Sequence, residues 1–367
     1  MEIGIIGLPS VGKTTLFNIV TRHFVKTGVF SASSAPNIGV AVVPDPRLSW
    51  LAAQYLPKKT TFATVNFVDV AGLVEGATKK DAFSGPFLSA LRAVDALVHV
   101  VRAFDDPAVP HPNESIDPVR DIHTVDTELL LGDMGVVEKR IERLEQDISK
   151  GRNRAEAEKE LVVFRRLEEC LGREQPLRSV EFSEEEKRQL RGYTFLSLKP
   201  IVYALNLGDG QTFSPALLPG LKVGERDGVL LVNGNPAIAF QGKLEEEIAQ
   251  LPEEEVADFL EAMGIAEPAA HRLIRTCYYV LDVISFFTVG DDECRAWTTH
   301  RGDTAPVAAG RIHSDLERGF IRAESFKYAD LHRLGTVAAI KDAGLFRLEG
   351  KEHVVEDGEI LNIRFNV

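Results

Sequence analysis

Residues 7–15 read GLPSVGKTT and directly follow the short apolar run EIGII. They fit the pattern G-x-x-x-x-G-K-[ST], which joins a strand to a helix through a phosphate-binding loop, the P-loop. The glycines allow backbone N–H groups to point at phosphate oxygens, Lys13 places a charge near the β- and γ-phosphates, and Thr14 offers a hydroxyl to Mg²⁺. We expect a helix over residues 13–23 that presents its positive end to the same anion. The residues predicted to hold the nucleotide here are Ser10, Val11, Gly12, Lys13, Thr14 and Thr15.

A second motif, Asp69-Val-Ala-Gly72, ends the apolar run NFVDV. In P-loop proteins a carboxylate at such a strand end holds Mg²⁺, so Asp69 is a predicted metal ligand. The N–H of Gly72 is predicted to contact the γ-phosphate and to respond when that phosphate leaves. The next residue is Leu73, where Ras-like GTPases carry the glutamine that orients the attacking water. Leucine cannot do this, so another residue has to position the water.

Length and composition indicate a globular chain of two or three domains, because 367 residues with 44% hydrophobic content can bury a substantial core. We find no apolar run long enough to span a membrane and no basic leader, and therefore expect a cytoplasmic protein. The three cysteines are scattered without metal or redox spacing, which suits a reducing compartment. A net charge of −13 excludes a wholly basic nucleic-acid coat but leaves local basic patches possible.

Apolar runs that alternate with helical patterns predict an α/β nucleotide-binding domain with a doubly wound, mostly parallel sheet. The expected strands are residues 2–7, 65–69, 96–101, 201–206 and 229–233. Residues 126–193 are rich in Glu, Lys, Arg and Leu, and their apolar positions recur at spacings of three and four. They predict two antiparallel helices, a coiled-coil-like hairpin inserted into the first domain. The last part mixes short strands and helices, as in a small α+β domain.

The base-reading motif is expected after a later strand, where YALNLGDG holds Asn206, Leu207 and Asp209. Guanine-binding proteins carry Asn-Lys-x-Asp at this place. Asp209 can still accept hydrogen bonds from guanine N–H groups, whereas Leu207 supplies neither the stem nor the charge of a lysine. The residues by themselves leave the choice between adenine and guanine open.

Taken together, these segments resemble the Obg-like ATPase (YchF) family over essentially the whole chain. The segments that carry the resemblance are GLPSVGKTTLFN, PNIGVAVVPDPRL, NFVDVAGLVEGA, HVVRAF, CRAWT, TAPVAAGRIHSD, ERGFIRAE and the closing IRFNV. The family combines a P-loop G domain of the translation-factor class, a coiled-coil insertion and a C-terminal TGS domain with the ubiquitin-like β-grasp fold. The resemblance implies a G domain at 1–125 and 194–282, the insertion at 126–193 and the TGS domain at 283–367. It also implies Mg²⁺-dependent hydrolysis of ATP and association with the ribosome and its RNA.

Individual site residues follow from the same resemblance. Asn206 and Leu207 are expected to contact adenine, although Asp209 replaces the family's glutamate and leaves GTP possible. His111, in the loop FDDPAVPHPNES, aligns with a family histidine proposed to replace the missing glutamine. Ser33 aligns with a threonine that reaches Mg²⁺. Ser10 stands where many members carry the asparagine linked to potassium stimulation, which argues against potassium dependence here.

Three functions remain open on the sequence. The first is a slow ATPase that regulates translation or a stress response from the ribosome, through basic clusters at residues 22–26, 58–59, 79–80 and 150–154. The second is a nucleotide-gated binding module with negligible turnover, whose partners are other proteins bound by the hairpin and the TGS domain. The third is a conventional GTPase.

Overall fold

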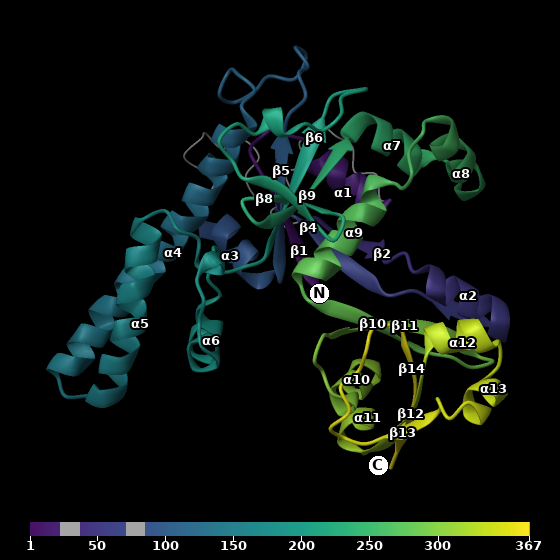
Figure 1. Ribbon diagram of the computed structural model, residues 1–367. Coiled ribbons are helices and arrows are strands. Elements are labelled where there is room, and N and C mark those ends of the chain that lie inside the picture. Colours follow the sequence, from purple (N-terminus) through teal and green to yellow (C-terminus); the bar gives the residue numbers. More distant parts are fainter. Residues whose placement is uncertain (23–36, 71–84, 367) are drawn as a thin grey trace. The chain divides into compact units, whose positions relative to one another are not determined.

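The computed structural model describes residues 1–22, 37–70 and 85–366 of the chain (Figure 1). These residues form two compact units. The first comprises Met1–Gly39 and Asn66–Thr276, and the second comprises Val40–Val65 and Cys277–Val367. Each unit is described by itself below.

The first unit is built on a sheet whose described strands follow the order β2-β4-β1-β5-β6-β9-β8-β7. Its strands are β1 (Glu2–Ile6), β2 (Asn37–Val42), β4 (Thr64–Asp69), β5 (Ala96–Arg102), β6 (Ile201–Leu207), β7 (Val223–Arg226), β8 (Val229–Val232) and β9 (Asn235–Gln241). The strands β4, β1, β5, β6 and β9 pair in parallel, and β8 and β7 continue as an antiparallel edge. Parallel pairing brings the carboxyl ends of β1, β4, β5 and β6 to one edge, where ligands of such sheets bind. The predicted P-loop fold, with a mostly parallel sheet, is confirmed.

Helices accompany this sheet along the chain. They are α1 (Lys13–Thr21), α3 (Gly85–Ala93), α6 (Glu184–Leu190), α7 (Gly242–Gln250), α8 (Glu253–Ala262) and α9 (Ala269–Val280), with short 3-10 turns η2 (Leu177–Ser179), η3 (Arg191–Tyr193) and η4 (Pro215–Leu217). The helix α1 ends at Thr21 because Arg22 adopts a left-handed backbone, two residues before the predicted end. None of the described helices is both long enough and apolar enough to cross a membrane.

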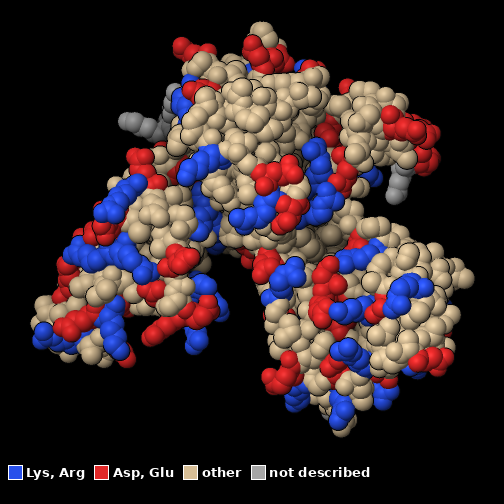
Figure 2. All heavy atoms as spheres, in the orientation of Figure 1, with Lys and Arg blue, Asp and Glu red and all other residues tan. Residues whose placement is uncertain are grey.

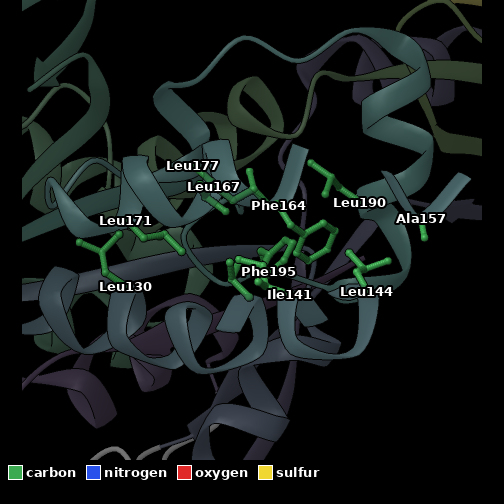
Figure 3. Packing of buried hydrophobic residues seen from close by; sticks show 11 residues of the cluster. Leu130, Ile141, Leu144, Ala157, Phe164, Leu167, Leu171, Leu177, Leu190 and Phe195 are labelled. Atoms are coloured by element: carbon green, nitrogen blue, oxygen red, sulfur yellow. The ribbon is translucent and has the colours of Figure 1, made fainter. Parts of the chain in front are cut away.

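A helical hairpin extends from the first unit (Figure 1). It consists of α4 (Pro118–Ser149) and α5 (Arg154–Gly172), which pack against each other and are joined by a four-residue turn. The residues of the predicted repeat form its core: Val137, Ile141, Leu144, Phe164, Leu167 and Leu171 are buried, and Ile148 and Leu161 pack beside them. Figure 3 shows that the side chains of Phe164, Phe195 and Ile141 meet between the helices. A period close to 3.5 residues places these positions on one face of each helix.

The second unit contains a sheet whose described strands follow the order β13-β12-β14-β10-β11-β3. Its strands are β3 (Lys59–Thr61), β10 (Val283–Thr288), β11 (Glu293–His300), β12 (Phe320–Lys327), β13 (Arg347–Glu349) and β14 (Glu359–Phe365). Its helices are α2 (Pro46–Tyr55), α10 (Ala305–Ile312), α11 (Ser314–Arg318), α12 (Tyr328–Leu334) and α13 (Val337–Asp342). A buried cluster that includes Ile284, Phe286, Ala308 and Leu361 lies between α10 and one face of the sheet. Strands and helices mix here as the sequence predicts, and the TGS assignment stays a prediction.

Residues 40–65 belong to the second unit, although the sequence indicates no boundary there. The Arg47 guanidinium donates to Asp45 and Asp357 and lies 5.2 Å from the centroid of the Phe287 ring. Trp50 packs edge-on against Tyr328, with ring centroids 5.5 Å apart. The contacts therefore group this segment with residues that follow it by more than two hundred positions. Pairing over such a distance leaves no local pattern from which it could be predicted.

Candidate nucleotide-binding site

The loop between β1 and α1 has the backbone of a phosphate cradle. Gly7 and Gly12 have φ angles of 144° and 100°, which residues with a side chain rarely adopt. A Cβ on Gly7 would lie 2.5 Å from the carbonyl oxygen of Val100, and one on Gly12 would lie 2.4 Å from Nδ2 of Asn206. Gly12 caps α1 without a side-chain hydrogen bond, so the cap itself leaves the first N–H groups available to an anion. Thr15 lies in this first turn and is partly buried.

Lys13, Thr14 and Asp69 come together at the mouth of this loop. The Oγ1 atom of Thr14 lies 3.3 Å from Oδ2 of Asp69, a carboxylate that is only 2% exposed. The ammonium group of Lys13 donates to the carbonyl oxygens of Gly7 and Leu8 at 3.0 and 2.7 Å. Burial lowers the pKa of Lys13 to about 8, and the nearby charge of Asp69 opposes that shift. A bound phosphate would favour the charged lysine again.

Ser10 and Val11 form the middle of the loop. Ser10 is exposed and has a φ of 61°, a left-handed conformation that asparagine tolerates better than serine. Val11 is buried, and its carbonyl oxygen accepts a hydrogen bond from Nδ2 of Asn206 at 3.0 Å. Serine therefore holds this backbone with less intrinsic preference than an asparagine would.

Asn206 links two loops in this structure. Its Nδ2 donates to Val11, and its Oδ1 accepts from the N–H of Gly242 at 3.0 Å. The side chain is 4% exposed, so it ties the phosphate loop to the start of α7 from within the protein. This contact was not predicted, because only the fold brings β6, β9 and the loop together. Base contact by Asn206 stays a prediction.

The other two residues of the predicted base-reading motif differ in exposure. Leu207 is 5% exposed, at the end of β6. Asp209 is 69% exposed and lies 3.9 Å from the ammonium of Lys243, which is also 3.4 Å from Asp106. Lys243 thus offsets the charge of two carboxylates beside the predicted base site. The sequence motif does not include it.

His111 lies in the loop between β5 and α4, and its side chain is almost fully buried. Its Nε2 atom lies 2.8 Å from Oδ2 of Asp121, and its Nδ1 atom accepts from the N–H of Asn113 at 3.1 Å. The side chains of His111 and Asp121 are 3% and 2% exposed. Arg120 also donates to Asp121, at 3.0 and 2.9 Å. The sequence shows the histidine but not its acidic partner, since ten residues and a turn separate the two.

Two residues of the predicted site, and a neighbour of one of them, lie outside the described residues. They are Gly72, predicted to contact the γ-phosphate, Leu73, which follows it, and Ser33, predicted to reach Mg²⁺. Among residues 1–22, 37–70 and 85–366, no three His, Cys, Asp or Glu side chains form a group that could hold a metal ion. Of the predicted magnesium ligands, Thr14 and Asp69 are the two that lie among the described residues.

Known proteins resemble this chain over its whole length. A family described as "50S ribosome-binding GTPase" matches residues 2–140, and a family named YchF-GTPase C-terminal domain, described as a protein of unknown function, matches residues 283–366. The chain is 42% identical to "Ribosome-binding ATPase YchF" of Bacillus subtilis, with 100% of both chains covered. It is 37% identical to "Obg-like ATPase 1" of Oryza sativa, with 100% of this chain and 92% of the relative covered.

The chain belongs to the Obg-like ATPase (YchF) family. The YchF GTPase of Schizosaccharomyces pombe has the same fold, with a TM-score of 0.85 at 30% identity over 99% of this chain and 97% of the other. The resemblance inferred from the motifs is thus confirmed over both units. In this YchF protein, the P-loop follows β1 and Asp69 ends β4, and the two strands are parallel neighbours in the sheet.

Proposed function

We propose that this YchF protein binds ATP with Mg²⁺ at the P-loop, hydrolyses it slowly and docks on the ribosome. The observation that carries the proposal is the meeting of Lys13, Thr14 and Asp69 at the end of β1, with Thr14 Oγ1 and Asp69 Oδ2 3.3 Å apart. Relatives over the full length are named ribosome-binding ATPases. A role in regulating translation or a stress response is part of the proposal.

The donor set suits magnesium. Thr14 supplies a hydroxyl and Asp69 a carboxylate, both oxygen ligands, and phosphate oxygens and water complete such sites. When bound, the ion neutralises charge that develops on the β- and γ-phosphates. The chain's own contribution is the N–H groups at the start of α1 and the ammonium of Lys13, which draw the phosphates into the loop. Ser33 is a proposed third ligand.

We propose adenine as the base. Position 207 is a buried leucine, so it offers neither the stem nor the charge that guanine-binding proteins place beside the base. Calorimetric titration of the purified protein with Mg·ATP and Mg·GTP tests this, and we expect ATP to bind more tightly. Tenfold tighter binding of GTP, about 1.4 kcal/mol, would instead make the protein a GTPase.

His111 is the proposed group that orients the attacking water, because Leu73 cannot. In this structure both ring nitrogens are engaged, by Asp121 and by Asn113, so the side chain has to leave these partners before it can act. We expect His111→Ala to bind ATP normally and to lower the single-turnover rate by about a hundredfold, the lower range for removal of such a group. An unchanged rate in this variant would exclude His111. Turnover at background level in the unmodified protein, with and without ribosomes, would favour the nucleotide-gated binding module.

Ribosome docking requires basic surface. Arg152 stands in the turn of the hairpin, while Arg154 pairs with Glu158 at 2.8 Å. Lys58 and Lys59 pair with Asp292 and Glu293. Figure 2 shows Lys and Arg mixed with Asp and Glu over the face in view. Residues 23–26 and 79–80 of the predicted clusters lie outside the described residues.

Cosedimentation tests the docking. The protein would be spun with purified ribosomes and Mg·ATP at roughly 50 and 200 mM salt, and binding through phosphate contacts should weaken strongly at the higher concentration. Binding that is independent of salt would exclude contact through RNA phosphates. The variant Arg152→Gln removes a charge from the turn of the hairpin and tests whether this turn contributes to ribosome binding. Arg173→Gln, at the opposite end of α5, is its control.

A further inference from the structure

The pair formed by His111 and Asp121 has a consequence for the reaction. We propose that Asp121 is a positioning residue that holds His111 in a withdrawn place, so that hydrolysis has to wait until this pair separates. The inference rests on the proposed role of His111 and adds the residue that restrains it.

The hydrogen bonds define which ring nitrogen carries the proton. Because Nδ1 of His111 accepts from the N–H of Asn113, the proton of the neutral ring is on Nε2. That N–H donates to Oδ2 of Asp121 at 2.8 Å, a charge-assisted hydrogen bond in a site from which solvent is almost excluded. Both nitrogens are therefore used within the protein, and neither is available to a water.

Asp121 cannot follow the histidine when it moves. It lies in the first turn of α4, where Asp117 caps the helix by accepting from the N–H of Arg120 at 3.0 Å. The guanidinium of Arg120 donates twice to Oδ1 of Asp121 and also donates to Ser115. The carboxylate is thus fixed to the helix, and movement of His111 alone has to break the pair. The cost of breaking it lowers the population of the active arrangement.

The variant Asp121→Asn removes the restraint with the least change in shape. Arg120 makes two hydrogen bonds to Oδ1, so the amide oxygen is expected to stay on that side. The amide NH₂ then faces Nε2–H of His111, and two donors oppose each other. The other ring tautomer does not solve this, because its Nδ1–H would oppose the N–H of Asn113. One bond of His111 is lost in either case.

We expect Asp121→Asn to raise the single-turnover rate of ATP hydrolysis about tenfold, as loss of a charge-assisted hydrogen bond in the withdrawn state implies. The KM for ATP should stay within about twofold, because the P-loop is untouched. In the double variant Asp121→Asn/His111→Ala, the rate should equal that of His111→Ala. The control is Asp126→Asn on the same helix, whose carboxylate accepts from Tyr203 and Arg178 and does not contact His111.

A purely structural role for Asp121 gives a different result. A variant that merely loosens the start of α4 would melt earlier and hydrolyse ATP at the original rate or more slowly. Such a rate in an Asp121→Asn protein that still binds ATP would overturn the inference. If His111→Ala itself leaves the rate unchanged, the proposed function of His111 fails first, so the two failures can be told apart.

A measurement on the unmodified chain covers the case in which the variant does not fold. In protein labelled with ¹⁵N-histidine, NMR should show a protected Nε2–H signal that is absent from His111→Ala. Saturation with Mg²⁺ and a non-hydrolysable ATP analogue should remove or broaden this signal, because the ring then leaves Asp121. A signal that persists unchanged at saturation would overturn the inference.

Discussion

The most informative perturbation of the fold is Asn206→Ala, because it separates support of the P-loop from recognition of the base. The side chain is 4% exposed, and its amide joins the carbonyl of Val11 to the N–H of Gly242. Alanine leaves both backbone groups without this partner. A buried group that loses its hydrogen bond costs about 1–3 kcal/mol, so the two together imply about 2–4 kcal/mol when some water enters.

Peptide-resolved hydrogen exchange without nucleotide is the suitable assay. The amide of Gly242 is held by Asn206 and should exchange about thirtyfold faster or more in Asn206→Ala, since 1.4 kcal/mol corresponds to a factor of ten. Trp50 and Trp297 both lie in the second unit. The thermal unfolding transition followed by their fluorescence should be the same in Asn206→Ala as in the original protein. Asn235→Ala is the matched control, because this asparagine lies on β9 and its side chain donates an exposed hydrogen bond to the carbonyl oxygen of Asn233.

A residue that only reads the base gives the opposite pattern. The exchange of the Gly242 amide would then stay the same in the free protein, and ATP binding alone would weaken. That result would refute the assignment of Asn206 as a support of the phosphate loop.

Three further predictions concern Gly12, Phe164 and His99 in the first unit. Gly12→Ala should abolish ATP binding in calorimetry, because its φ is 100° and the added Cβ would meet Asn206 at 2.4 Å. Phe164→Ala should destabilise the hairpin by about 3–5 kcal/mol in urea unfolding followed by circular dichroism, whereas the 72%-exposed Val162→Ala should change little. Burial lowers the pKa of His99 from 6.5 to about 4, so the folded protein resists its protonation, and stability should fall as the pH drops from 6.5 to 4. The loss amounts to about 3 kcal/mol at the acid end, and His99→Gln should flatten this part of the profile.

Each of these has a clear contrary result. ATP binding by Gly12→Ala at the original affinity would mean that the loop relaxes around the added methyl group. Equal unfolding curves for Phe164→Ala and Val162→Ala would show that the hairpin core contributes little. If the stability of His99→Gln fell between pH 6.5 and 4 as steeply as that of the original protein, the loss of stability in acid would be due to groups other than His99.

Much of this protein could be predicted from local patterns. The strand, glycine loop and helix around Lys13 are contiguous, so the P-loop is complete within a short stretch. The hairpin core follows from spacings of three and four, because helical geometry alone puts Ile141 and Phe164 on the inner faces of their helices. The P-loop and the hairpin core can be predicted because each depends on residues that are close together in the sequence.

Contacts between distant segments were decided only by the tertiary structure. The pair of Asn206 with Val11 spans 195 positions, and that of Arg47 with Asp357 spans 310. His111 could be chosen as a candidate, yet its burial against Asp121 depends on how the loop folds onto α4. The sequence by itself determined which chemical groups this protein has and the local elements that carry them. The tertiary structure decided which groups meet, because hydrogen bonds across the sheet and between loops depend on parallel pairing and packing that leave no local pattern.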